Sequence, residues 1–95
     1  MAVYLVTWDL NKEKSNYAEA RAQVIARLQR YQHTKDPGLD SVWFLDGGTW
    51  SAEDVFKDIK PVFDDNDRFI ITRIREGEKM GWLGQNVWAW INSRL

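Results

Sequence analysis

The first segment of the chain carries apolar side chains on both faces when it is read as a β-strand. Residues 2–9 (AVYLVTWD) are rich in β-branched and aromatic residues, which favour strands. Val3 and Leu5 fall on one face, and Tyr4 and Trp8 fall on the other, because side chains alternate along a strand. A strand that is apolar on both faces is normally covered on both faces. Two layers of structure must therefore pack against the sheet that contains it.

A second segment, Leu39–Asp46, repeats this two-sided pattern. Val42 and Phe44 fall on one of its faces, and Trp43 and Leu45 fall on the other. We therefore predict a second strand that also lies between two layers.

The rest of the chain predicts helices, turns and two further strands, one of them short. Apolar residues at helical spacing indicate the helices, and Asp, Asn, Gly and Pro indicate the turns. Pro61 should end the second helix near Lys60, because proline has no N–H to donate within a helix. The predicted elements are a helix from Ser15 or Asn16 to about Gln32, a turn over His33–Gly38, a short return strand at Thr49–Trp50, a helix capped by Ser51, a turn over Asp64–Asp67, a strand over Arg68–Arg75 and a helix over Gln85–Arg94.

This order of elements predicts one α+β domain over residues 1–95, of ferredoxin-like βαββαβ topology. A tryptophan-rich C-terminal extension, residues 76–95, adds a further helix. Two crossover helices can cover only one face of the sheet, so the other face needs the C-terminal helix, a second copy of the chain, or both. A homodimer packed sheet against sheet is the preferred interpretation.

Composition limits the classes of function. The chain has no cysteine, which excludes a disulfide scaffold and a thiolate metal site. The net charge of −1 argues against strong nonspecific binding of nucleic acid. The apolar run at the start is too short to span a membrane and follows no basic leader, so we expect a cytoplasmic protein without a membrane partner.

Three features together resemble the small CRISPR-associated endonuclease-like family, the structural partner of the spacer integrase. The first strand ends in an aspartate, in the sequence VTWD at residues 6–9. The second strand contains SVWF at residues 41–44, which is similar to the family's serine-valine-phenylalanine stretch, and the spacing to the next helix and the final strand also agrees. The similarity extends over about Ala2–Arg75. The tail, residues 81–91, looks more like a related group of short bacterial and phage proteins, some labelled SinR-like.

The resemblance implies a ferredoxin-like homodimer. In family members described as nucleases, the aspartate that closes the first strand binds a divalent metal at the dimer cleft. Asp9 matches that aspartate and is therefore the candidate catalytic and metal-binding residue, with Mg²⁺ or Mn²⁺ as cofactor. Two such carboxylates could share the ion and activate water for attack on a phosphodiester. The alternative is that Asp9 caps the turn into Asn11.

A group of basic residues occupies the last predicted strand and the loop after it. Arg73 and Arg75 are two positions apart, so they share a face of the strand, and Lys79 lies just beyond. These three residues could bind a phosphate backbone. They could equally be charges that protect an edge strand from aggregation.

Aromatic residues are the other candidates for contacts with a partner. Trp82 and Trp88 could stack on nucleic-acid bases. The alternative is that they pack, on the same chain or in a dimer, together with Tyr4, Trp8 and Trp43.

Two other groups of polar residues have structural interpretations. The aspartates of Asp64–Asp67 lack the glycine and glutamate of a calcium loop, so we expect a solvated turn. His33 is expected to be an exposed turn residue.

The preferred function is therefore a small dimeric protein that acts by interaction with nucleic acid or protein. One alternative is a metal-dependent endonuclease that uses paired Asp9 residues. Another is an antitoxin or phage-encoded regulator that binds a protein partner through its tryptophan surface.

Overall fold

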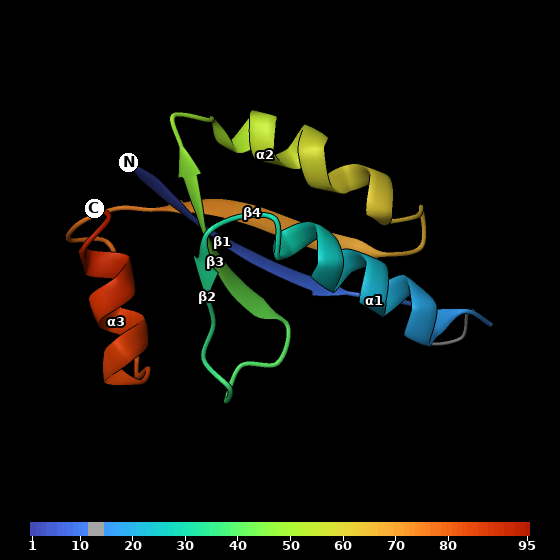
Figure 1. Cartoon of the computed structure of the whole chain (residues 1–95), viewed down its shortest axis with the longest axis horizontal. Coiled ribbons are helices and arrows are strands. Elements are labelled where there is room, and N and C mark those ends of the chain that lie inside the picture. Colours follow the sequence, from blue (N-terminus) through green and yellow to red (C-terminus); the bar gives the residue numbers. More distant parts are fainter. Residues whose placement is uncertain (12–14) are drawn as a thin grey trace.

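The computed structural model describes residues 1–11 and 15–95 as an α+β fold with a four-stranded antiparallel sheet (Figure 1). The strands lie in the order β2-β3-β1-β4. The elements are β1 (Ala2–Asp9), α1 (Tyr17–Leu28), β2 (His33–Thr34), β3 (Val42–Gly48), α2 (Ala52–Ile59), a 3₁₀ helix η1 (Lys60–Val62), β4 (Arg68–Ile74) and α3 (Gln85–Asn92).

Helices α1 and α2 pack on what we call the first face of the sheet, which carries Tyr4, Val6 and Trp8. Val24 and Leu28 of α1 belong to this layer of the core, and so do the buried apolar residues of α2. Tyr4, Val6 and both α1 residues are no more than 2% exposed. The even positions of β1 are therefore covered, as the pattern of the strand predicts.

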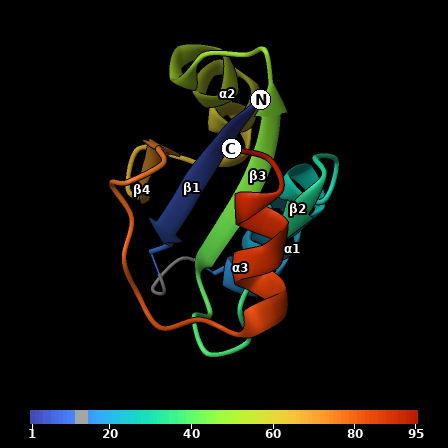
Figure 2. The ribbon, with the colours of Figure 1, turned by 90° about the vertical axis from the view of Figure 1, so that its left-hand side faces the viewer.

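The second face, which carries Val3, Leu5 and Phe44, is covered in part by α3 of the same chain. Val87 and Ile91 of α3 form a separate cluster of buried residues with Val3 and Phe44. Figure 2 shows α3 in front of the sheet, over β3 and beside β1, on the side away from α1 and α2. The sequence allowed the C-terminal helix, a second copy of the chain, or both to cover the second face, and in the structure the C-terminal helix lies there. It folds back over the sheet of its own subunit.

The neighbour of β3 differs from the prediction. The short strand β2 (His33–Thr34) pairs with β3 inside the segment that was predicted as a turn. The predicted return strand at Thr49–Trp50 is wrong, because the chain turns away after β3. Gly48 adopts a positive φ of 58°, and the Tyr4 hydroxyl donates a hydrogen bond to the Trp50 carbonyl at 2.6 Å. That bond holds the chain across the end of the sheet.

The helix boundaries follow local signals. In α2 the Ser51 side chain accepts from the Asp54 N–H, and the Asp54 side chain accepts from the Ser51 N–H, which forms a capping box. The second helix ends at Ile59, and Pro61 lies in the 3₁₀ helix that follows, in agreement with the prediction. None of the helices in the described part of the chain is long and apolar enough to cross a membrane.

Candidate interaction surface on the second face

A groove of about 490 Å³ lies between the second face of the sheet, α3 and the segment that connects β4 to α3. Leu5, Val42 and Phe44 contribute to it from the sheet, and Leu83 and Trp88 contribute from the connection and the helix. Figure 2 shows this connection passing around the sheet before it enters α3. The second face is therefore only partly covered, and an apolar groove lies beside its buried cluster.

Two large apolar side chains at the groove are almost fully exposed. Met80 is 97% exposed and Trp82 is 99% exposed, and both line the groove. From the sequence, Trp82 could pack on its own chain, pack in a dimer or stack on bases. In this structure its side chain faces solvent. Exposed apolar groups gathered beside a groove are typical of a surface that binds another molecule.

Of the other aromatic candidates, Tyr4, Trp8 and Trp43 belong to the core. All three are under 10% exposed, and the rings of Trp8 and Trp43 are 6.3 Å apart. Trp88 is half-buried, and the Lys79 ammonium group lies 5.9 Å from the centre of its ring. These four side chains pack within the subunit.

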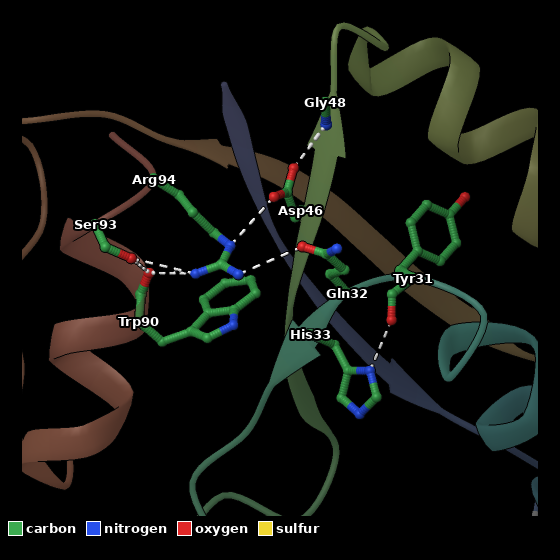
Figure 3. Close-up of polar contacts among 8 residues, drawn as sticks. All are labelled: Tyr31, Gln32, His33, Asp46, Gly48, Trp90, Ser93 and Arg94. Carbon is green, nitrogen blue, oxygen red and sulfur yellow. Dashed lines mark hydrogen bonds and ion pairs between the residues drawn. The ribbon is translucent and has the colours of Figure 1, made fainter.

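The position of α3 depends on Arg94, which follows the last turn of the helix (Figure 3). Its Nε lies 3.1 Å from Oδ2 of Asp46 on β3, a carboxylate whose side chain is only 6% exposed. The guanidinium group lies 4.0 Å from the Trp90 ring and donates to Gln32 Oε1 at 3.4 Å. A cation that is both stacked and paired with a buried carboxylate fixes the end of the helix against the sheet.

The other end of α3 is held by a second carboxylate. Oδ2 of Asp36 accepts the N–H of Gly84, the N-cap position of α3, at 2.8 Å, and Oδ1 accepts the N–H of Gly38. These two bonds hold the pKa of Asp36 below its usual range. Sequence reasoning missed both anchors of α3, because each joins residues that are 48 positions apart.

Asp9 is the last residue of β1 and is exposed. It is paired in register with Arg68 of β4, and both residues border a hollow of about 320 Å³ that Thr7 and Ile70 also line. Within residues 1–11 and 15–95, no three His, Cys, Asp or Glu side chains are grouped closely enough to hold a metal ion. In this chain the arrangement supplies one carboxylate at an open strand end.

Asp67, which is 7% exposed, organises the turn between the 3₁₀ helix η1 and β4. Its Oδ1 accepts the N–H of Asn11 at 3.0 Å, and its Oδ2 accepts the N–H of Asp64 at 3.0 Å. The turn is therefore as predicted, but its central carboxylate is buried instead of solvated. Asp67 therefore accepts the N–H of Asn11. The alternative interpretation of Asp9 had expected Asp9 to cap the turn into Asn11.

The predicted basic residues occupy two different places. Arg73 is opposite Tyr4 in register and so lies on the first face, and with Arg75 it lines a hollow of about 280 Å³. Lys79 lies in the groove, 3.4 Å from Glu76 Oε1. The structure therefore does not bring the three cations together in one phosphate site.

His33 is half-buried in β2 and is not an exposed turn residue. Its Nδ1 lies 2.8 Å from the Tyr31 carbonyl oxygen (Figure 3). Its ring packs 4.9 Å from the Trp43 ring. The side chain has a packing role at the edge of the sheet.

A scan against protein-family models gives no match for this chain, and a search of curated proteins gives no match either.

Proposed function

We propose that this chain is a cytoplasmic, homodimeric interaction module of ferredoxin-like topology that binds a protein partner through the groove on its second face. The observation that carries the proposal is the apolar lining of the groove, with Met80 and Trp82 exposed beside it. An apolar cleft with aromatic anchors suits an apolar segment of another protein.

The strand order supports the topology in this proposal. The order β2-β3-β1-β4, with α1 and α2 as crossovers on one face, agrees with a βαββαβ sandwich to which α3 is added. The resemblance of the sequence to the CRISPR-associated endonuclease-like family and the SinR-like proteins stays a proposed relationship.

The charges near the groove favour a protein over nucleic acid. Lys79 is paired with Glu76, and Glu78 lines the groove as well. Arg73 and Arg75 lie outside the groove. Phosphate binding draws its free energy from cations that release counterions, and a cation that already has a carboxylate partner contributes less.

A photo-crosslinker at the rim tests the proposal. Trp82 is replaced by a benzophenone amino acid in cells of the source organism, and the crosslinked species is identified by mass. We expect one discrete protein adduct, reduced at least fivefold by Met80→Glu, a change at an exposed position. The same crosslinker at Gln23, which is exposed on α1, is the matched control. A nucleic-acid adduct, or equal labelling from position 23, would overturn the proposal.

A second candidate function is a metal-dependent endonuclease that uses Asp9 with Mg²⁺ or Mn²⁺. The exposed position of Asp9 at the end of β1, beside a hollow, favours it. Purified protein is incubated with RNA and DNA in each metal. Cleavage that chelator and Asp9→Ala both abolish would support this function, and cleavage that survives Asp9→Ala would exclude it.

A further inference from the structure

Strand β4 forms an outer edge of the sheet along seven residues. Within the described residues its strand neighbour is β1, on one side, and its other side is not paired with a strand. The opposite edge of the sheet is β2, which is only two residues long. A long edge strand presents unpaired N–H and C=O groups that can pair with another strand, whereas a very short edge strand does not.

Exposed apolar side chains border this edge on both faces. Ile70 lies on the second face and is 60% exposed. On the first face, Phe56 of α2 is 40% exposed and stacks on Phe69 of β4 with ring centres 5.5 Å apart. A strand added beside β4 would cover apolar surface above and below the sheet, in addition to forming backbone hydrogen bonds.

The charges that normally protect an edge strand lie at the ends of β4. Arg68 Nη1 donates to the carbonyl oxygens of Asp65 and Asp67, so its guanidinium is bound to the preceding turn. Arg73 lies near the other end. The four residues between them, FIIT at positions 69–72, carry no charge. The middle of the edge is therefore open to pairing.

We propose that two copies of this chain pair through β4, antiparallel, about a two-fold axis at Ile71. This inference rests on the homodimer of the proposed function and assigns the surface that forms it. Ile71 is the central residue of Arg68–Ile74, so an axis there pairs all seven residues of the strand. An axis at Ile70 or Thr72 would leave residues at the strand ends unpaired.

The strand is self-complementary about this axis. Arg68 lies opposite Ile74 of the second copy, and Phe69 lies opposite Arg73 of the second copy, so no like charges face one another. Phe69 is already stacked on Phe63 at 4.2 Å, and an arginine beside that stack adds a cation–π contact. These pairings favour a second copy of this chain over an unrelated strand.

Single cysteines test the axis directly, because the chain has none of its own. In an antiparallel pair, the residue on the two-fold axis lies about 4.5–5.5 Å from its copy between Cα atoms, which a disulfide can bridge. We expect oxidised Ile71→Cys to form the dimeric disulfide at least tenfold faster than Ile70→Cys, Thr72→Cys or the exposed control Glu19→Cys. Faster crosslinking at position 70, 72 or 19 would overturn the pairing.

An uncrosslinked measurement gives a second test. Ile70→Lys places a charge at the middle of the edge on an already exposed position, and Ile70→Thr is the matched uncharged control. We expect sedimentation to show at least a tenfold rise in the dimer Kd for Ile70→Lys, with an unchanged circular dichroism spectrum. A dimer unaffected by Ile70→Lys would overturn the β4 interface, and a wild-type monomer would overturn the homodimer itself. The Trp82 adduct in the Ile70→Lys variant separately reports whether the groove binds its partner.

Discussion

The Nε of Arg94 lies 3.1 Å from Oδ2 of Asp46, and this ion pair joins the C-terminal end of α3 to β3. The pair is mostly buried on the carboxylate side, and Asp46 Oδ1 accepts the Gly48 N–H at the same time. The helix that forms one wall of the groove is therefore held by a tertiary contact as well as by its apolar face.

Removal of this ion pair should destabilise the protein. We expect Arg94→Ala to lower the free energy of unfolding by about 1.5–3 kcal/mol, because the nearly buried Asp46 carboxylate loses a charged hydrogen-bond donor. Arg94→Lys should recover part of this loss but not the stacking on Trp90. Urea unfolding of Arg94→Ala, of Asp46→Asn and of the double variant, each compared with wild type, gives the coupling energy of the pair, and Arg94→Lys is measured in the same way. A loss below about 0.5 kcal/mol for Arg94→Ala would show that the pair behaves as an ordinary surface ion pair.

The contact between Tyr31 and Asp58 should make stability depend on alkaline pH. Burial, and then the hydrogen bond to Asp58, raise the pKa of Tyr31 well above its usual range. Above about pH 10 the unfolded chain loses this proton while the folded chain keeps it, so stability falls as the pH rises. We expect wild-type protein to lose stability between pH 9 and 11 more steeply than Tyr31→Phe, as measured by urea unfolding. Equal slopes would contradict the prediction, and Tyr17→Phe is the control.

The contact between Asp36 and Gly84 should make α3 sensitive to acid. The pKa of Asp36 is lowered by the two backbone N–H groups, so its stabilising effect is present above the pKa of an unfolded aspartate, about 3.9, and is lost as the pH falls below it. Asp36→Ala should therefore speed amide exchange in residues 85–92 at neutral pH and have little effect near pH 2. Asp40→Ala, at an exposed neighbouring aspartate, should leave this exchange unchanged.

A methyl group at Gly47 should disturb the contact that turns the chain after β3. A Cβ there would lie 2.5 Å from Cε2 of Tyr4, whose ring is buried. We expect Gly47→Ala to cost about 1–3 kcal/mol through overpacking. Gly77→Ala is the matched comparison, because its φ of 80° is strained for alanine although its Cβ would meet no atom within 4 Å. Thermal unfolding of both variants separates the two effects, and equal costs would argue against the contact with Tyr4.

Much of the fold could be predicted from local patterns. The two-sided apolar pattern of β1 and β3 required cover on both faces, and α3 covers the second face with Val87 and Ile91. The cap at Ser51 and the break at Pro61 placed α2 within one residue of its end. Hydrophobic period and capping act over a few residues, so they can be read from the chain directly.

The candidate site was predicted less well. Trp82 was recognised as a candidate, but the groove beside it requires the sheet, the connection and α3 to meet, and no sequence motif indicates that. Asp36, Asp46 and Arg94 were missed as anchors. The strand β2 was predicted as a turn, because a two-residue strand has too little pattern of its own to be recognised. It is defined by its pairing with β3.

The amino-acid sequence by itself determined that this chain needs a sheet covered on both faces, since side-chain direction along a strand follows from backbone geometry. The tertiary structure decided that the cover of the second face is the chain's own C-terminal helix, and that this cover leaves Ile70 of β4 exposed. That choice depends on contacts between residues 48 positions apart, whose free energy exists only when the chain has brought them together.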